Sequence, residues 1–417
     1  MISRRRVLLR TFASAGAYPF TRFARAQAPQ VGAIRIGLGT ALSGPFAIIG
    51  NDIHAGAQFA VDLLNRKGGA AGRPIELVVK DTKTNPNDAV AAAREFLGEG
   101  VKFIVGGLYG AEAAGQIPIV AGANGIYIIE ATQGMAFTHE SFARNMFRTS
   151  ENSVESMAGF TQIALDRYPN VTNWVYFGLD SAVNRAGADV FNKVMTDAYA
   201  RVGKTITFHD PIWVKLGAGD FRNELSAIMG SSIEGMCSQV TGADGITCYT
   251  QARALGLQNK IKVIYDQGNE IGFAKAMKQN VPPNMWVSTP WYHGLYPNDP
   301  ISNAIYDAYL TKTNDRYPQG WLHFGAAPVF ALARGIEAAG GSTDPDKIIA
   351  ALESGVEFHT MKGPAHIRKE DHQIVADLNY INYAPAPEEP GFKIADMIKL
   401  DGAKYLEPAS PGKPYVP

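Results

Sequence analysis

Few residues of this chain stand in a pattern that could do chemistry. The sequence contains no nucleophile elbow and no His-Glu-x-x-His motif, and its eight histidines are scattered without the spacing of metal ligands. The pair His139-Glu140 stands alone and is interpreted as a surface feature. The turn from Gly37 to Leu42 lacks the third glycine of a dinucleotide-binding loop, and no Walker loop occurs. The sequence therefore predicts a protein that is not an enzyme and that holds no metal and no cofactor.

Cys237 and Cys248 are the two cysteines, eleven positions apart. A zinc site needs four ligands, and a disulfide scaffold needs more than one pair, so neither is expected. One disulfide and two buried free thiols both remain open.

The first 26 residues differ from the rest in charge. They hold six arginines and no acidic residue, with Arg4 and Arg5 ahead of a short apolar run and Ala24 and Ala26 at its end. This pattern is typical of a twin-arginine export signal that is removed near Ala26. The apolar run is too short to span a bilayer, and a basic disordered leader is the alternative. The sequence thus predicts a periplasmic protein.

Charge and length bound the rest of the chain. The chain has 39 basic and 39 acidic residues, and 33 basic residues against 39 acidic ones remain beyond the signal. A mildly acidic protein without a basic stripe is a poor candidate for nucleic-acid binding, because that affinity comes from neutralising phosphates. About 390 residues are too many for one compact core, so we expect two domains.

Apolar runs alternate with amphipathic segments from residue 34 onward. A first series has expected strands at 34–38, 75–79, 102–105 and 126–129, and expected helices at 54–65 and 86–99. A second series has expected strands at 174–177, 206–208, 233–236 and 261–265, and expected helices at 186–201, 220–229 and up to 255. Asn85 is expected to cap the helix that Pro86 opens. The alternation is typical of βαβ units on parallel sheets, so the sequence predicts an α/β fold of two consecutive lobes.

Short motifs along nearly the whole chain after the signal carry a family resemblance. They are Ala41-Leu42-Ser43-Gly44-Pro45, Gly56-Ala57-Gln58-Phe59-Ala60, Asp81-Thr82-Lys83-Thr84-Asn85-Pro86, Phe147-Arg148-Thr149, Gln251-Ala252-Arg253-Ala254-Leu255-Gly256 and Met361-Lys362-Gly363-Pro364. Each motif is short, but their order and spacing together are specific. With them the chain resembles the leucine/isoleucine/valine-binding family of type I periplasmic solute-binding proteins of ABC transporters.

The resemblance implies two Rossmann-like lobes joined by a three-crossover hinge. After the signal at 1–26, the first lobe would take 27–150 plus 290–360, and the second lobe 151–289 plus 361–417. Ligand would bind between the lobes, at the carboxyl ends of the strands. The implied protein is a monomer that traps a small molecule and delivers it to the membrane permease subunits of an ABC transporter. A periplasmic sensor that presents the solute to a membrane receptor is the alternative.

The resemblance also places a pocket. Relatives that bind amino acids hold the carboxylate with a hydroxyl residue and backbone amides, but the serine expected near Gly110 is missing. Their ammonium site needs an acid after the last strand of the second lobe, and an ungapped count puts Gln267 there. Asp266 would serve only if the register slipped by one residue. The implied ligand-binding set is Tyr109, Gly110, Ala111, Ala131, Thr132, Gln133, Asn184, Thr241, Gln267, Trp291 and Trp321.

The implied pocket differs from an α-amino-acid site. Two tyrosines that wall the family's cleft are replaced, one by Val183 or Asn184 and the other by Thr241. Flat apolar walls from Trp291 and Trp321 with amide donors suit an aromatic or other apolar carboxylate, or a neutral amide. An amino-acid binder with a rearranged pocket is the alternative, and each tryptophan could equally be an ordinary packing residue.

Overall fold

The structure of the protein is a computed structural model that describes residues 32–416. The predicted export signal lies outside these residues. Residues 33–417 form one compact unit. Within the described residues, no helix combines the length and the apolar character that crossing a membrane requires.

The first sheet is parallel, with strand order β2-β1-β3-β4-β5. Its strands are β1 (Ile34–Thr40), β2 (Ile75–Asp81), β3 (Phe103–Gly106), β4 (Ile126–Ile129) and β5 (Met146–Arg148). In β4, Ile126 and Ile128 pack in the core shared with α1 and α10, whereas Tyr127 and Ile129 pack against α2 and α3. A parallel sheet covered by helices on both faces needs such uninterrupted apolar strands, and this is why the sequence pattern identified β1 to β4, although it missed β5.

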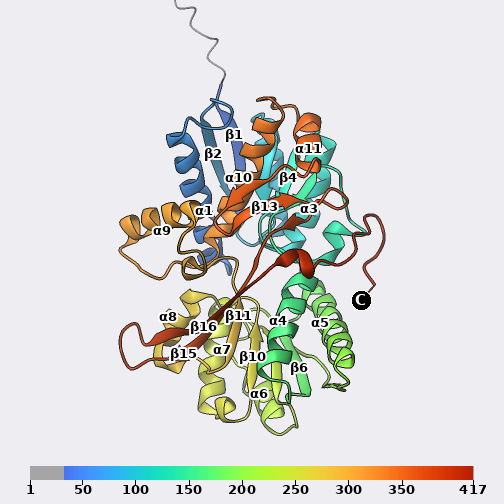
Figure 1. The fold of residues 1–417 in the computed structure, drawn as a ribbon, viewed down its shortest axis with the longest axis vertical. Helices are drawn as coiled ribbons and strands as arrows, with labels where there is room; N and C mark the ends of the chain where they lie inside the picture. Colours follow the sequence, from blue (N-terminus) through green and yellow to red (C-terminus); the bar gives the residue numbers. More distant parts are fainter. Residues whose placement is uncertain (1–31, 417) are drawn as a thin grey trace, which may run out of the picture. The chain divides into compact units, whose positions relative to one another are not determined.

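Six helices belong with this sheet (Figure 1). They are α1 (Ala47–Arg66), α2 (Pro86–Gly98), α3 (Gly110–Gly122), α9 (Pro300–Thr313), α10 (Leu322–Ala338) and α11 (Pro345–Glu353). The predicted cap of α2 is confirmed, because the Asn85 side chain accepts hydrogen bonds from the backbone N–H groups of Asn87 and Asp88. Helices α1 and α10 pack backbone to backbone at Gly56, where a Cβ atom would lie 1.9 Å from the carbonyl oxygen of Leu322.

The second sheet joins a parallel part to an antiparallel edge, in the order β16-β15-β11-β10-β9-β6-β7, with β8 also paired to β6. Its strands are β6 (Asn173–Leu179), β7 (Thr207–Phe208), β8 (Ile212–Val214), β9 (Gly235–Gln239), β10 (Val263–Asp266), β11 (Met285–Ser288), β15 (Leu378–Pro385) and β16 (Phe392–Leu400). Its helices are α4 (Ser153–Arg167), α5 (Ala182–Arg201), α6 (Arg222–Met229), α7 (Gly242–Ala254) and α8 (Ile271–Met277). The sequence pattern missed β8, β11, β15 and β16. Strands β15 and β16 lie far from the other strands in sequence and join the sheet only at its antiparallel edge.

Three segments connect the parts of the chain that pack on the two sheets. The first lies between β5 and α4, the second follows β11, and the third leads into β15. The sequence-based boundary at 360/361 divides the small sheet of β12 (Phe358–Thr360), β13 (Gly363–Ile367) and β14 (Ile374–Val375), whose buried residues pack in the same core as α1 and α10. We therefore propose that the third crossing lies at 376–377. We call the part on the first sheet, including β12 to β14, the first lobe, and the part on the second sheet the second lobe.

The two cysteines are free and buried. Cys237 lies on β9 and packs in the core with α4 and α5, whereas Cys248 lies on α7 and packs in the core on the other face of the sheet. The sheet separates the two thiols, so of the two open alternatives the pair of free thiols is confirmed. Burial raises the pKa of both thiols, which keeps them protonated and unreactive.

Candidate functional site

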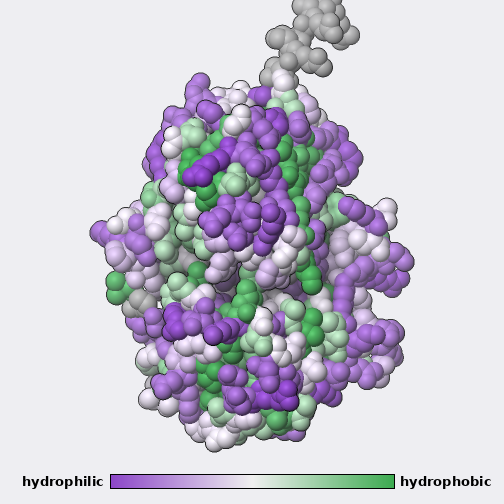
Figure 2. Space-filling view, turned by 180° about the vertical axis from the view of Figure 1, so that it is seen from behind, coloured by the Kyte–Doolittle hydropathy of each residue, from purple (hydrophilic) through white to green (hydrophobic). Residues whose placement is uncertain are grey.

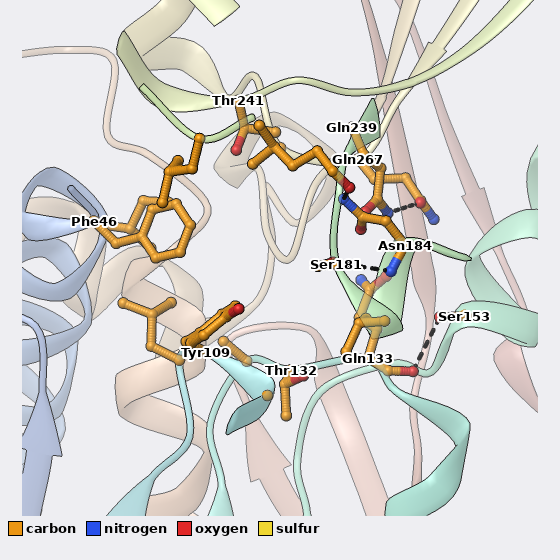
Figure 3. A pocket seen from close by; sticks show the side chains of 18 of the residues that line it. Phe46, Tyr109, Thr132, Gln133, Ser153, Ser181, Asn184, Gln239, Thr241 and Gln267 are labelled. Atoms are coloured by element: carbon orange, nitrogen blue, oxygen red, sulfur yellow. Dashed lines mark hydrogen bonds between the residues drawn. The ribbon is translucent and has the colours of Figure 1, made fainter. Parts of the chain in front are cut away.

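A cavity of about 200 Å³ lies at the carboxyl ends of the strands of both sheets (Figure 3). From the first lobe it is lined by Phe46, Ile49, Leu108, Tyr109, Gly110, Ala131, Thr132, Gln133, Trp321 and Phe324. Ser153, Leu179, Asp180, Ser181, Val183, Asn184, Leu216, Gln239, Thr241, Gln267 and Gly268 line it from the second lobe. Open α/β sheets place their ligands at this edge, because the loops that follow parallel strands converge there.

Nine of the eleven residues named from the sequence line this cavity: Tyr109, Gly110, Ala131, Thr132, Gln133, Asn184, Thr241, Gln267 and Trp321. Ala111 lies instead on a neighbouring cavity of about 460 Å³, which shares Tyr109, Gly110, Ser181 and Val183 with the first. Trp291 lies in neither cavity. Contact between these residues and a ligand stays a prediction.

Trp291 and Trp321 were both predicted from the sequence to line the pocket, but the structure gives them different environments. Trp291 is fully buried in the core of the first lobe, and its indole Nε1 donates a hydrogen bond to the Ser302 hydroxyl at 3.0 Å. The prediction that Trp291 lines the pocket is therefore corrected. Trp291 is a packing residue of the core, and its indole N–H already has a hydrogen-bond acceptor in the protein. Trp321 stands at the start of α10, lines the cavity and has its ring 5.6 Å from that of Phe324.

Aromatic rings dominate the first lobe's side of the cavity. The Phe46 and Tyr109 rings lie 6.3 Å apart at 57°, and the Trp321 and Phe324 rings lie on the same side. Apolar side chains also reach the surface near the cavity. Leu216 in its wall is about half exposed, and Ile48, next to the lining residue Ile49, is more than half exposed. On the face shown in Figure 2, hydrophilic and hydrophobic residues both reach the surface, with hydrophilic residues covering most of it. Such rings can sandwich a flat apolar ligand.

Six helices begin at the cavity wall, because each follows a strand or loop that ends there. Their first residues or N-caps among the lining residues are Phe46 of α1, Tyr109 of α3, Ser153 of α4, Ser181 of α5, Thr241 of α7 and Trp321 of α10. The first N–H groups of a helix lack intrahelical acceptors and carry the positive end of the helix dipole. No lysine, arginine or histidine is among the lining residues. Backbone N–H groups at helix N-termini can bind a small anion without a cationic side chain.

Gln267 and Asp266 lie differently in the loop that follows β10. Gln267 lines the cavity, whereas Asp266 is fully buried and turned into the loop. The Asp266 carboxylate accepts hydrogen bonds from the backbone N–H groups of Gly268 and Asn269, at 2.9 and 2.7 Å, and from the Asn269 side chain at 2.8 Å. Burial raises the pKa of Asp266 to about 6. Asp266 thus holds the loop in shape and is not available to a ligand.

One acidic side chain, Asp180, is found among the lining residues. It is about half exposed and forms an ion pair with Arg185, with 2.7 Å between Arg185 Nη2 and Asp180 Oδ1. The Arg185 guanidinium in turn lies over the Trp213 ring, 4.9 Å from its centroid. Because its charge is already paired, Asp180 is a poor partner for a ligand ammonium group.

The two lobes approach each other closely at Gly110. A Cβ atom at this position would lie 3.0 Å from Val183 Cγ2, across the cavity, and 3.3 Å from Thr132 Oγ1. Gly110 is the first residue of α3 and has no positive φ, so close approach and not turn geometry is what favours glycine here. The Thr132 hydroxyl makes no hydrogen bond to any residue that the structure describes.

Comparisons with known proteins agree with this geometry. Residues 33–383 match the periplasmic binding protein family. The chain belongs to that family. A relative from Pseudomonas aeruginosa, a leucine-, isoleucine-, valine-, threonine- and alanine-binding protein, is 26% identical over 336 residues, which are 79% of this chain and 84% of the relative.

Two solved structures share the fold of this periplasmic binding protein. One is a solute-binding protein of an ABC transporter from Rhodopseudomonas palustris in complex with 3,4-dihydroxy benzoic acid, with a TM-score of 0.77, 18% identity and coverage of 89% of this chain and 98% of the other. The second is a branched-chain amino acid transporter substrate-binding protein from Streptococcus pneumoniae in complex with isoleucine, with a TM-score of 0.72, 20% identity and coverage of 88% and 99%. The predicted family and the predicted two-sheet α/β fold are thereby confirmed.

Sequence reasoning missed several residues that line the cavity of this periplasmic binding protein, notably Phe46, Ser181 and Gln239. Gln239 is the last residue of β9, and Ser181 follows β6 by two positions. Counting a few residues past each parallel strand would have found both, since every such strand ends at the same edge. Phe46 directly follows the Ser43-Gly44-Pro45 motif, so the family motif itself pointed to it.

Proposed function

We propose that this protein is the solute-binding component of an ABC importer of the branched-chain amino-acid-binding type, and that its ligand is a small aromatic or other apolar carboxylate. The single observation that carries the ligand class is a cavity with an aromatic wall, six helix N-termini and no basic side chain among its lining residues. A carboxylate would be held by backbone N–H groups at the start of the helices, and its apolar body would lie against the rings.

The remaining parts of the proposal follow from the family and the sequence. The protein would act in the periplasm after export through the twin-arginine signal, as a monomer, and would pass its ligand to the permease subunits of the transporter. It would bind neither nucleic acid nor cofactor and would catalyse no reaction. Contacts from both lobes would favour a closed form, which the permease would recognise.

Matched carboxylates and amides test the ligand class. A ligand that binds only the folded protein raises its stability, by about 2.7 kcal/mol at one hundred times the Kd. In a thermal-shift screen followed by calorimetry, we expect benzoate to stabilise the protein and benzamide, which has nearly the same shape without the charge, to do so less. Equal stabilisation by both would show that the helix N-termini do not select an anion. If only amino acids bind, the alternative of a rearranged amino-acid pocket replaces the proposal.

A further inference from the structure

The Gln267 side chain, although it lines the cavity, has its hydrogen-bonding groups occupied by the protein. Its Nε2 donates to the hydroxyls of Ser156, at 3.0 Å, and Tyr265, at 3.1 Å. Its Oε1 accepts a hydrogen bond from Gln239 Nε2, and Figure 3 shows this contact at the second-lobe wall. Gln267 therefore has no N–H group left for a ligand.

The direction of this hydrogen-bond chain is set by a backbone carbonyl. The Tyr265 hydroxyl lies 2.9 Å from the carbonyl oxygen of Ser156, an atom that can only accept, and 2.5 Å from the Ser156 hydroxyl, where either oxygen can be the donor. We infer that Tyr265 gives its one proton to the carbonyl and accepts from the Ser156 hydroxyl. The Tyr265 oxygen therefore accepts from Gln267, so the nitrogen of the Gln267 amide points toward Tyr265 and its oxygen toward Gln239. Tyr380 donates to the same carbonyl at 2.6 Å, and both tyrosines are fully buried. The tyrosines and the carbonyl are thus held in place by the core of the second lobe.

Gln239 is consequently oriented with its oxygen free. Its Nε2 gives one of its two N–H groups to Gln267 Oε1, and its Oε1 makes no hydrogen bond to any described residue. A second amide in the same wall is arranged alike, because Asn184 Nδ2 donates to the carbonyl oxygen of Leu179 at 2.8 Å. The second lobe therefore presents two amide oxygens without a protein donor, each beside one remaining N–H, opposite the first lobe's aromatic rings and Thr132 (Figure 3).

We propose that Gln239 determines the specificity of this site, and that the ligand carries a neutral hydrogen-bond donor, such as a phenolic hydroxyl, at the end opposite its carboxylate. This inference rests on the proposed function and refines it. An ammonium group is a poor occupant, because Asp266 is buried in its loop and Asp180 is paired with Arg185. If the ligand placed a hydrogen-bond acceptor against Gln239 Oε1, two acceptor oxygens would face each other with no proton to share. Burying two unsatisfied acceptors costs binding free energy. Gln267 is a positioning residue that holds the Gln239 amide in this orientation.

Three ligands that differ at one atom position test the proposal on the unaltered protein. Para-hydroxybenzoate has a donor, benzoate has no polar group, and para-methoxybenzoate has only an acceptor at that end. By calorimetry we expect para-hydroxybenzoate to bind at least about tenfold more tightly than para-methoxybenzoate, because a site built to accept a proton discriminates against ligands without one. Equal affinity of all three overturns the inference and leaves the proposed function standing. If none of the three binds, both fall.

Variants separate the roles of the two glutamines. Gln239→Leu should lower the affinity ratio of the hydroxy to the methoxy ligand by about tenfold. Gln279→Leu, which replaces an exposed glutamine outside the cavity, should keep the ratio. Gln267→Leu should lower the ratio because the Gln239 amide becomes free to turn, whereas Gln267→Glu, which keeps an acceptor for Gln239 Nε2, should preserve it. A ratio unchanged in Gln239→Leu contradicts the specificity role, and a ratio unchanged in Gln267→Leu contradicts the positioning role. Should a variant fail to fold, the ligand series on the unaltered protein still decides.

Discussion

The first lobe faces the cavity with the rings of Phe46, Tyr109 and Trp321, whereas the second lobe faces it with the amides of Gln239 and Gln267. The rings are extensions of the hydrophobic core: Trp321 belongs to the same buried cluster as α1 and α10. The amides are held by hydrogen bonds that lead back to a buried tyrosine and a backbone carbonyl. Under the proposed function, the first lobe would set the shape of the ligand, and the second would set its orientation and polar pattern.

The largest expected effects come from replacing the two tryptophans, Trp291 in the core of the first lobe and Trp321 in the cavity wall. Trp291→Ala should lower the free energy of unfolding by about 3–5 kcal/mol, because it empties a buried site and leaves Ser302 without its donor. Trp321→Ala should weaken binding of the carboxylate on the order of 2–4 kcal/mol, because the ligand loses a flat surface. Chemical denaturation and calorimetry on both variants measure the two quantities. If Trp321→Ala binds as tightly as the parent, the first lobe does not set the ligand's shape.

Leucine tests whether the second lobe lacks a partner for an ammonium group. We expect the parent to bind leucine weakly, because Asp266 is buried in its loop and Asp180 is paired with Arg185. Gln267→Glu should raise leucine affinity by about 1.5–3 kcal/mol, the usual contribution of a hydrogen bond to a charged group. Calorimetry with leucine measures both. Micromolar binding of leucine by the parent would mean that another acid reaches the cavity.

Closure between the two lobes should be sensitive to one methyl group. Gly110→Ala should weaken ligand binding by about 1–3 kcal/mol, because its Cβ would lie 3.0 Å from Val183 Cγ2 across the cavity. The change falls in a helix, where alanine is favourable, so stability should not fall. Val183→Ala in the same chain removes the opposing methyl group and should restore binding. Failure of this double variant to recover would place the effect within the first lobe.

A further predicted effect concerns pH and the second lobe near the hinge. Burial raises the pKa of Glu155 to about 8 from its ordinary value of 4.5. Between these values the carboxyl is protonated in the folded protein and ionised in the unfolded one, so unfolding releases a proton and stability falls as pH rises. One such group contributes at most about 1.4 kcal/mol per pH unit.

Urea denaturation from pH 5 to pH 8 measures this slope. Glu155→Gln should make the decline shallower, because glutamine keeps an acceptor for the Asn152 N–H without titrating. Glu388→Gln, at an exposed position, should keep the parent's slope. Identical slopes in the parent and in Glu155→Gln would show that Glu155 does not titrate in this window.

Strand and helix placement could be predicted where one periodic signal dominated. The apolar runs of β1, β2, β4 and β6 identified the two series, and Asn85 with Pro86 identified the start of α2. The strands β15 and β16 could not be assigned in this way, because they join the second sheet from the far end of the chain. The family motifs supplied the connectivity that periodicity lacked, and they brought nine of eleven named residues to one cavity.

What the sequence by itself determined is the set of local and compositional properties: the alternation of strands and helices, the absence of catalytic motifs, and the family to which the chain belongs. Only the tertiary structure decided which side chains meet. Trp291 and Trp321 are both tryptophans at expected positions, yet one fills a core and the other a cavity wall, because that depends on helices α9 and α10 packing on a distant sheet. Likewise, Asp266 and Gln267 are neighbours, but the loop hydrogen bonds to Asp266 leave Gln267 facing the cavity. Which of two adjacent polar groups is free depends on partners far away in sequence, and only folding brings those partners together.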